Sequence, residues 1–291
     1  MLGAPYCTTE MILDRCVSLA GKQQRAILAS DDLDHPTAGQ IVGNEPEEMA
    51  KAAIAICERK FDLVDLNFAC PVNKALKRKR GGMLMSDPVL AIEIVHAVVE
   101  ASPKPVTLKV RQKFNDADSE ENFWELAEAA RKAGCAAITV HGRSVEQKYT
   151  GIADWDFIKR VKEHFADWVV IGSGDVFDAQ AAVNMLEQTG VDAAAVARGV
   201  IGNPWIFQQT KALLEGKPVE KPSLAEQKKI LQKHFADVCE FYGPRIGPRN
   251  MRKFGIKYSK MHATPKKIRM AFVECKTPDD LQRVLDEYYV D

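Results

Sequence analysis

The sequence predicts an α/β fold in which a (β/α)₈ TIM barrel, residues 1–216, precedes a small all-helical domain, residues 223–291. Short apolar segments alternate with helical segments from residue 6 onward, which is typical of a parallel sheet with right-handed crossovers. Polar residues follow many of the apolar segments, as in barrels whose active site lies at the carboxyl ends of the strands. No G-x-G-x-x-G follows the first strand, which disfavours an open dinucleotide-binding sheet.

The individual elements follow from local signals. Strands are expected at residues 6–12, 38–42, 63–68, 106–110, 136–140, 168–171 and 193–197. Asp87-Pro88 supplies an N-cap with proline at the first helical position, and Gly134 falls just past a helix, where a left-handed residue is favoured. Residues 217–222, Lys-Pro-Val-Glu-Lys-Pro, are typical of a linker. Ser223-x-x-Glu226 then matches a capping box, and only helical periodicity follows.

Composition restricts the class of protein. The chain has 291 residues, 46% of them hydrophobic, and its 40 basic residues balance its 40 acidic ones, so any affinity for nucleic acid must come from local clustering. Its seven cysteines include no C-x-x-C pair, which argues against a disulfide scaffold or a structural zinc site. No apolar run is long enough to span a membrane, and no signal peptide is evident. We therefore expect a soluble cytoplasmic protein, a monomer, that binds neither metal nor membrane.

Cys70 is the leading candidate for chemistry. The apolar strand before it ends in Asn67-Phe68-Ala69-Cys70-Pro71, and Pro71 blocks continuation of the strand, so Cys70 falls on a turn where it can face a ligand. Taken alone, Cys70 is better explained as a small buried hydrophobic residue than as a catalyst. The loop that follows carries five cations and ends in a glycine pair, Lys74, Lys77, Arg78, Lys79 and Arg80 before Gly81-Gly82. Such a loop favours a polyanionic substrate brought up to the thiol.

Polar groups after other strands suit a flavin mononucleotide. Gln40 ends the second strand, and its amide could bind the edge of a heterocycle. Lys109 lies inside an apolar strand, where a cation is costly without an anionic partner, and His141 follows the next strand. Residues 171–175, Ile-Gly-Ser-Gly-Asp, and 197–199, Ala-Arg-Gly, offer bare backbone donors where barrels bind phosphate. The lysine would stabilise negative charge on the reduced flavin, and a thiol, mostly protonated at neutral pH, could supply a proton.

A stretch of one charge sign marks the helical region. Between residues 241 and 270 the charged residues are all basic: Arg245, Arg249, Arg252, Lys253, Lys257, Lys260, Lys266, Lys267 and Arg269. Charge runs are usually solvated faces, but in a chain that is neutral overall this one favours a phosphate-binding surface.

These motifs together resemble the tRNA-dihydrouridine synthases, from about Gly3 to the C-terminus. The segments that carry the resemblance are Thr9-Glu10-Met11-Ile12, Gln40-Ile41-Val42-Gly43, Asn67-Phe68-Ala69-Cys70-Pro71, Val106-Thr107-Leu108-Lys109-Val110-Arg111, His141-Gly142-Arg143, Gly199-x-x-Gly202-Asn203-Pro204-Trp205 and Arg252-Lys253. The resemblance implies an FMN-containing barrel and a helical domain that hold tRNA between them. Cys70 would then donate a proton to C5 of a flipped-out uridine, reduced FMN would give hydride to C6, and NADPH would reduce the flavin.

The resemblance also assigns site residues. The positions that would hold FMN are Gln40, Lys109, His141, Ser173, Gly174, Asp175, Ala197 and Arg198. Those expected to contact the RNA are Asn67, Lys74, Arg78, Arg143, Arg252 and Lys253. Three positions depart from the family pattern, because Ala69 and Ala197 stand where glycine is usual and Ser173 stands where asparagine is usual. Each change adds bulk or removes an amide, which would weaken binding of FMN.

Two other functions remain open. A dihydroorotate-type dehydrogenase is another FMN barrel that acts on the same pyrimidine bond, but it would need no basic helical domain. A catalytically silent RNA-binding protein could keep the barrel as a scaffold. Neither the uridine that is modified nor a preference for NADPH over NADH can be read from the sequence.

The strand count is one short of a closed barrel. Seven strands are expected, whereas closure needs eight, since a gap leaves two edges unpaired. Residues 9–12 resemble the second strand of the family and not its first. We therefore expect one strand and one helix upstream of Met1, unless another element or a neighbouring chain fills the gap.

Overall fold

The structure is a computed structural model that describes residues 2–18, 28 and 35–290. The chain divides into two compact units, which are described separately. The first unit contains Gly3–Val176 and Ala181–Val196, and the second contains Leu2, Phe177–Gln180 and Ala197–Asp291. This division differs from the expected boundary after residue 216, because residues 197–216 group with the helical region.

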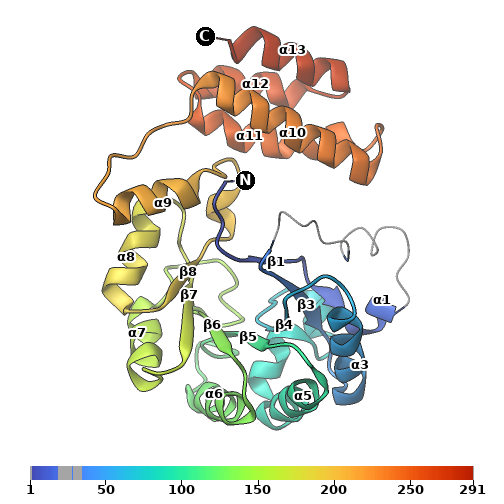
Figure 1. Ribbon diagram of the computed structural model, residues 1–291, viewed down its shortest axis with the longest axis vertical. Helices are drawn as coiled ribbons and strands as arrows, with labels where there is room; N and C mark the ends of the chain where they lie inside the picture. The colour runs from blue at the N-terminus through green and yellow to red at the C-terminus, as the bar shows by residue number, and fades with distance from the viewer. Residues whose placement is uncertain (1, 19–27, 29–34, 291) are drawn as a thin grey trace. The chain divides into compact units, whose positions relative to one another are not determined.

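A parallel sheet organises the first unit (Figure 1). Its strands run in the order β1-β3-β4-β5-β6-β7-β8, and β2 also pairs with β3. The strands are β1 Cys7–Thr8, β2 Ile12–Leu13, β3 Thr37–Val42, β4 Leu63–Phe68, β5 Val106–Arg111, β6 Ala137–His141, β7 Val169–Ser173 and β8 Ala193–Ala195. This TIM-barrel-like succession of parallel strands and helices confirms the predicted fold class.

The first predicted strand is two short ones. β1 pairs with β3 at Thr37 and Ala38, whereas β2 pairs with β3 at Ile41 and Val42, so both lie along the same edge of β3. Among the described residues, no strand pairs β1 or β2 with β8, so the sheet is open there.

Helices of the first unit cover one face of the sheet (Figure 1). They are α1 Asp14–Ser18, α3 Pro46–Cys57, α4 Asn73–Leu76, the 3₁₀ turn η1 Gly81–Ser86, α5 Pro88–Ala101, α6 Glu121–Ala133, α7 Trp155–His164 and most of α8 Ala179–Thr189. The expected caps are present: Asp87 accepts a hydrogen bond from the N–H of Leu90, and Gly134 ends α6 with a φ of 102°.

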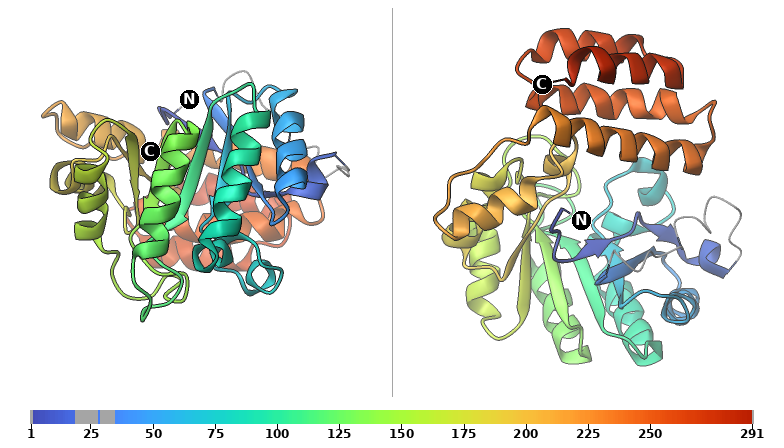
Figure 2. Two further views of the ribbon diagram at one scale, coloured as in Figure 1. Left: turned by 90° about the horizontal axis from the view of Figure 1, so that it is seen from below. Right: turned by 45° about the horizontal axis from the view of Figure 1, so that its top comes forward.

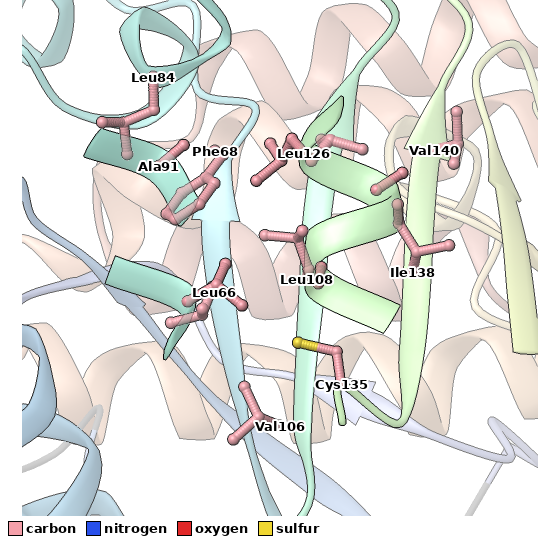
Figure 3. Packing of buried hydrophobic residues seen from close by; sticks show 14 of the residues in the cluster. Leu66, Phe68, Leu84, Ala91, Val106, Leu108, Leu126, Cys135, Ile138 and Val140 are labelled. Atoms are coloured by element: carbon pink, nitrogen blue, oxygen red, sulfur yellow. The ribbon is translucent and has the colours of Figure 1, made fainter. Parts of the chain in front are cut away.

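Alternate residues of each strand separate an apolar face from a polar one. Leu66, Leu108 and Ile138 point toward the helices and join one buried cluster with Leu126 of α6 (Figure 3). The residues that alternate with them along the strands face the other side of the sheet, and they include Asp65, Asn67, Thr107, Lys109, Thr139 and His141. The inner face of the sheet is therefore lined with polar groups, which a purely structural barrel interior would not need.

The second unit is helical (Figure 2, orange to red). It contains the 3₁₀ turn η2 Arg198–Val200, α9 Ile206–Leu214, α10 Leu224–Tyr242, α11 Gly247–Tyr258, the 3₁₀ turn η3 Ser259–Met261, α12 Pro265–Glu274 and α13 Pro278–Tyr288. The capping box formed by Ser223 and Glu226 opens α10 as predicted. A separate apolar cluster holds these helices together and includes Trp205, Met251 and Phe272. Because Trp205 is part of this cluster, the segment before α9 belongs with the helices.

Three expected absences concern the described residues only. No helix there is long and apolar enough to cross a membrane. No group of three or more metal-ligating side chains gathers in that part of the chain. All seven cysteines are free thiols.

Candidate active site

The polar face of the sheet gathers four of the eight predicted flavin residues. Gln40, Lys109, His141 and Ser173 lie on β3, β5, β6 and β7, in the carboxyl half of each strand. Strand register places Asn67 opposite Lys109 and His141 opposite Ser173 on neighbouring strands. The structure thus brings together residues that are far apart in the chain, which the spacing of polar residues at strand ends predicted.

Lys109 is a half-buried cation with few partners. Its ammonium donates a hydrogen bond to Ser173 Oγ over 3.4 Å, and this is its one bond to the described residues. Desolvation lowers the pKa of Lys109 to about 8, partly opposed by the charge of Asp65 and reinforced by that of Arg111. A half-buried ammonium with one long hydrogen bond can accept an anionic partner at little extra desolvation cost, so this position suits an electron-rich ligand edge.

His141 lies between a cation and a hydroxyl. Its Nε2 is 3.5 Å from Arg143 Nη1, and its Nδ1 is 3.2 Å from Ser173 Oγ. Ser173 Oγ therefore links the His141 ring to the ammonium of Lys109, which donates to it.

Arg143 is a structural residue of this site. Its side chain is 1% exposed, and Nη2 lies 2.7 Å from both carboxylate oxygens of Asp175. It also donates to the carbonyls of Thr150 and Gly151 over 2.9 and 2.7 Å. We expected Arg143 to contact RNA, but a guanidinium directed at these loop oxygens is suited to fixing the loops after β6 and β7.

The turn after β7 is built from backbone that L side chains rarely adopt. Gly174 has a φ of 124°, and a Cβ there would stand 2.6 Å from that of Ala153. Asp175 has a φ of 58°, and its carboxylate accepts from the N–H of Ala153 and from Arg143. Its contribution to a predicted phosphate site is therefore the shape of the turn, because a carboxylate held in this way offers no attraction to a phosphate.

Cys70 lies on a turn that is held from three sides. Cys70 is buried, and 8% of its surface is exposed. Asn67 Oδ1 accepts from the N–H groups of Ala69 and Cys70 over 3.1 and 3.0 Å. Gly82 donates its N–H to the carbonyl of Cys70, and Arg111 Nε donates to the carbonyl of Ala69. These bonds fix the backbone that carries the thiol.

The glycine pair after the cationic loop packs on this turn. Gly81 has a φ of 59°, and a Cβ there would lie 2.9 Å from the Cβ of Cys70. A Cβ on Gly82 would lie 2.8 Å from Val145 and 3.0 Å from the carbonyl oxygen of Cys70. The pair is therefore needed for close approach to Cys70, a role beyond that of a loop end.

The five cations of the loop are not equivalent. Lys74, Lys77, Arg78 and Lys79 are exposed. Arg80 instead donates to Asn44 Oδ1 over 3.0 Å and lies 3.6 Å from a carboxylate oxygen of the buried Asp14. Lys74 and Arg78 are thus open to a polyanion, as their predicted role requires, whereas Arg80 anchors the loop.

Two predicted flavin residues belong to the other unit. Ala197 precedes the η2 turn, and the Arg198 guanidinium lies 4.8 Å from the centre of the Phe177 ring, all within the second unit. Their role as phosphate ligands stays a prediction.

The predicted RNA-binding residues of the helical unit lie on α11. Lys253 is exposed, with its ammonium 5.7 Å from the centre of the Phe254 ring. Arg252 is half-buried and donates to the carbonyl of Val273 over 3.5 Å. Lys253 is accordingly the more accessible of the two cations.

Sequence reasoning gave no role to Asp65, Thr107 or Arg111, although all three contribute to the site. Arg111 donates to the carbonyls of Ala69, Ser144 and Lys148. The sequence did contain a signal for Arg111. Successive side chains of a strand alternate between its two faces, so Arg111, two residues after Lys109 in β5, must share the face of Lys109.

Comparison with known proteins identifies the family. The family model described as dihydrouridine synthase (Dus) matches residues 2–291. A probable tRNA-dihydrouridine synthase of Rickettsia prowazekii (strain Madrid E) is 35% identical over 293 residues, 99% of this chain and 88% of that protein. tRNA-dihydrouridine synthase B of Proteus vulgaris is 33% identical over 290 residues, with coverage of 99% and 88%.

Among solved structures, histamine dehydrogenase from Rhizobium sp. 4-9 matches with a TM-score of 0.49 and 14% identity, over 86% of this chain and 43% of that one. The match of the family model and the two synthases over nearly the whole chain is decisive. This chain belongs to the dihydrouridine synthase family and is an oxidoreductase, as the resemblance predicted.

Proposed function

We propose that this protein reduces uridines of tRNA to 5,6-dihydrouridine, with Cys70 as proton donor. The observation that supports this most directly is a thiol fixed on the turn after β4, beside a strand that carries the sparsely partnered Lys109. Family membership implies a flavoprotein that takes part in tRNA processing, and the relatives are named for tRNA.

The residues present fit a flavin. Lys109 has capacity for an anionic partner, and the hydroxyl of Ser173 lies beside its ammonium. FMN, when bound, supplies hydride for C6 of uracil after NADPH has reduced it. Gln40, His141 and Gly174 complete the surface that would hold the ring and the start of its phosphate tail, and Ala197 and Arg198 would bind the phosphate itself.

Cys70 would act on the other carbon of the double bond. Its Sγ would give a proton to C5 of the flipped-out base, and the fixed backbone would keep the sulfur pointing toward the ring. Asn67 contributes by holding the turn, since its carbonyl oxygen is occupied by two backbone N–H groups.

Binding of the polyanion would rest on exposed cations. We infer that Lys74 and Arg78 of the loop and Lys253 and Arg252 of α11 contact tRNA phosphates. Residues 1–216 would then carry catalysis, and RNA binding would be shared between their cationic loop and residues 223–291. A dihydroorotate-type enzyme has no use for such a basic surface.

The test compares two buried thiols. We expect Cys70→Ala to bind FMN and accept electrons from NADPH normally, while dihydrouridine formation on an unmodified tRNA transcript falls by about 10² or more, the scale for loss of a general acid. Cys135, buried on the apolar side of the same sheet, is the matched control, and Cys135→Ala should retain activity per folded molecule. Wild-type activity in Cys70→Ala would exclude this thiol as the donor, and a protein that never binds flavin would favour the silent RNA-binding alternative.

A further inference from the structure

Asp65 is a buried acid that the proposed chemistry does not use. It lies on β4 and is 4% exposed. Its Oδ1 accepts a hydrogen bond from Thr107 Oγ1 and its Oδ2 accepts one from Gln40 Nε2, both over 2.6 Å. Burial raises the pKa of Asp65, and these two bonds together with the charge of Lys109 oppose that rise. Burying a carboxylate is costly, so the presence of Asp65 at this position calls for an explanation.

The bond to Gln40 begins a chain that ends at Cys70. Gln40 Oε1 accepts from Asn67 Nδ2 over 2.7 Å. Asn67 Oδ1 then accepts from the N–H groups of Ala69 and Cys70. Two side-chain amides therefore connect the carboxylate of Asp65 to the backbone of the reactive turn, and both amides are buried.

The chemistry at the two ends sets the orientation of both amides. At one end the carboxylate of Asp65 accepts, so it must face the nitrogen of Gln40. At the other end backbone N–H groups donate, so they must face the oxygen of Asn67. Rotating the Gln40 amide by 180° would set its oxygen against the carboxylate, and rotating that of Asn67 would set its nitrogen against two N–H groups. Either change leaves buried polar atoms unpaired, which is costly.

The surroundings keep the carboxylate in place. Burial raises the pKa of the Tyr6 hydroxyl to about 12, and the negative charge of Asp65 adds to this rise. Lys109 is the cation that opposes the burial of Asp65. Asp65 thus sits among a phenol, a hydroxyl, an amide and an ammonium on the polar face of the sheet.

We propose that Asp65 is a positioning residue, which orients the Gln40 and Asn67 amides and through them fixes the turn that presents Cys70. This inference rests on the proposed function, in which Cys70 must be aimed at the substrate. The orientation of Gln40 also decides which of its atoms faces the flavin side of the sheet.

Two substitutions at Asp65 separate hydrogen bonding from charge. Asp65→Asn keeps an oxygen that can accept from Gln40, and its nitrogen can donate to Thr107, so the amide orientation survives without the charge. Asp65→Leu has a similar shape but can accept nothing. If orientation is what matters, Asp65→Asn should retain most of the wild-type behaviour and Asp65→Leu should not.

The first readout needs neither flavin nor tRNA. Alkylation of Cys70 by iodoacetamide, followed by peptide mass spectrometry, reports how firmly the turn is held. We expect Asp65→Leu to raise that rate about fivefold or more, on the scale of a lost buried hydrogen bond. Asp62→Leu is the matched control, because Asp62 accepts from the N–H of Thr37 at the other end of β4 and does not bond to the two amides. It should leave the alkylation rate of Cys70 unchanged.

The second readout is turnover with flavin and tRNA saturating. Asp65→Leu should lower kcat about tenfold or more with little change in KM, since displacement of a reacting group by about 1 Å can cost 10²-fold. Wild-type alkylation of Cys70 in Asp65→Leu, or equal impairment of Asp65→Asn and Asp65→Leu, would overturn the proposal. Should Asp65→Leu not fold, Gln40→Met breaks the same chain while Asp65 keeps its bond to Thr107. Because Gln40 is also placed at the flavin, only the alkylation rate of Cys70 is compared in that variant, and a wild-type rate would overturn the proposal. If Cys70→Ala stayed active, the proposed function would fail, but the alkylation rates would still decide whether Asp65 holds the turn.

Discussion

The two compact units differ in the burial of their charged side chains. In the first unit Asp14, Asp65, Arg111 and Arg143 are buried, and each is bonded to specific groups. In the described part of the second unit no charged residue is buried, and the basic side chains of residues 245–269 lie at or near the surface around an apolar cluster. A buried charge acts singly and in fixed geometry, whereas exposed charges act together and are screened by salt. The first arrangement suits chemistry, and the second suits attraction of a polyanion.

The largest expected effect is loss of a buried charge from the first unit. We expect Arg143→Ala to lower the free energy of unfolding by about 2 to 4 kcal/mol, because it removes the buried guanidinium that pairs with Asp175 and donates to two loop carbonyls. Urea denaturation measures this. Lys266→Ala, an exposed cation on α12, should change stability by less than about 0.5 kcal/mol. Equal effects of the two substitutions would remove the distinction between the units.

A smaller effect is expected from the pH dependence of Lys109. Its pKa is lowered from an ordinary value of 10.5 to about 8, chiefly by burial. Between these two values the folded flavin-free protein releases this proton while the unfolded chain keeps it, so stability due to Lys109 rises with pH across that window. Lys109→Met should remove this rise, worth about 1 to 3 kcal/mol, and should stabilise the flavin-free protein near neutral pH. Denaturation at pH 7 and pH 10 tests it, and identical pH profiles would show that Lys109 is solvated.

The smallest effect per residue is expected on α11. Arg252→Ala combined with Lys253→Ala should weaken tRNA binding and lower the dependence of log K on log salt by about one for each phosphate that is no longer neutralised. The fold should persist, because neither side chain is buried. Filter binding over a salt series measures the slope. If the slope does not change, the RNA surface lies elsewhere.

The sequence was informative about the position of side chains and much less about their partners. Polar residues at strand ends predicted that Gln40, Lys109 and His141 serve one site, and strand register places them on the same face of the sheet. The same signals could not distinguish two cations with different partners. Lys109 has one hydrogen bond to the described residues, whereas Arg143 pairs with Asp175, which is 32 residues away in sequence. A linear pattern carries no information on pairing between distant loops, so Arg143 was assigned to RNA.

The same limit applied to boundaries. Residues 6–12 read as one apolar strand, but β3 is paired by two short strands instead. The linker at residues 217–222 was expected to separate the barrel from the helices, whereas residues 197–216 group with the second unit, in which Trp205 packs with the helices. Composition locates a flexible segment, whereas packing decides to which core its neighbours belong.

The turn at Cys70 leaves its sulfur a single degree of freedom. Asn67 holds the N–H of Cys70 and Gly82 holds its carbonyl, so the sulfur moves only by rotation about the Cα–Cβ bond. That rotation has three staggered wells, and exchange among them is far faster than the closure of a loop. As the proposed proton donor, Cys70 would thus be aimed by the choice of one rotamer, without a slower rearrangement of the chain.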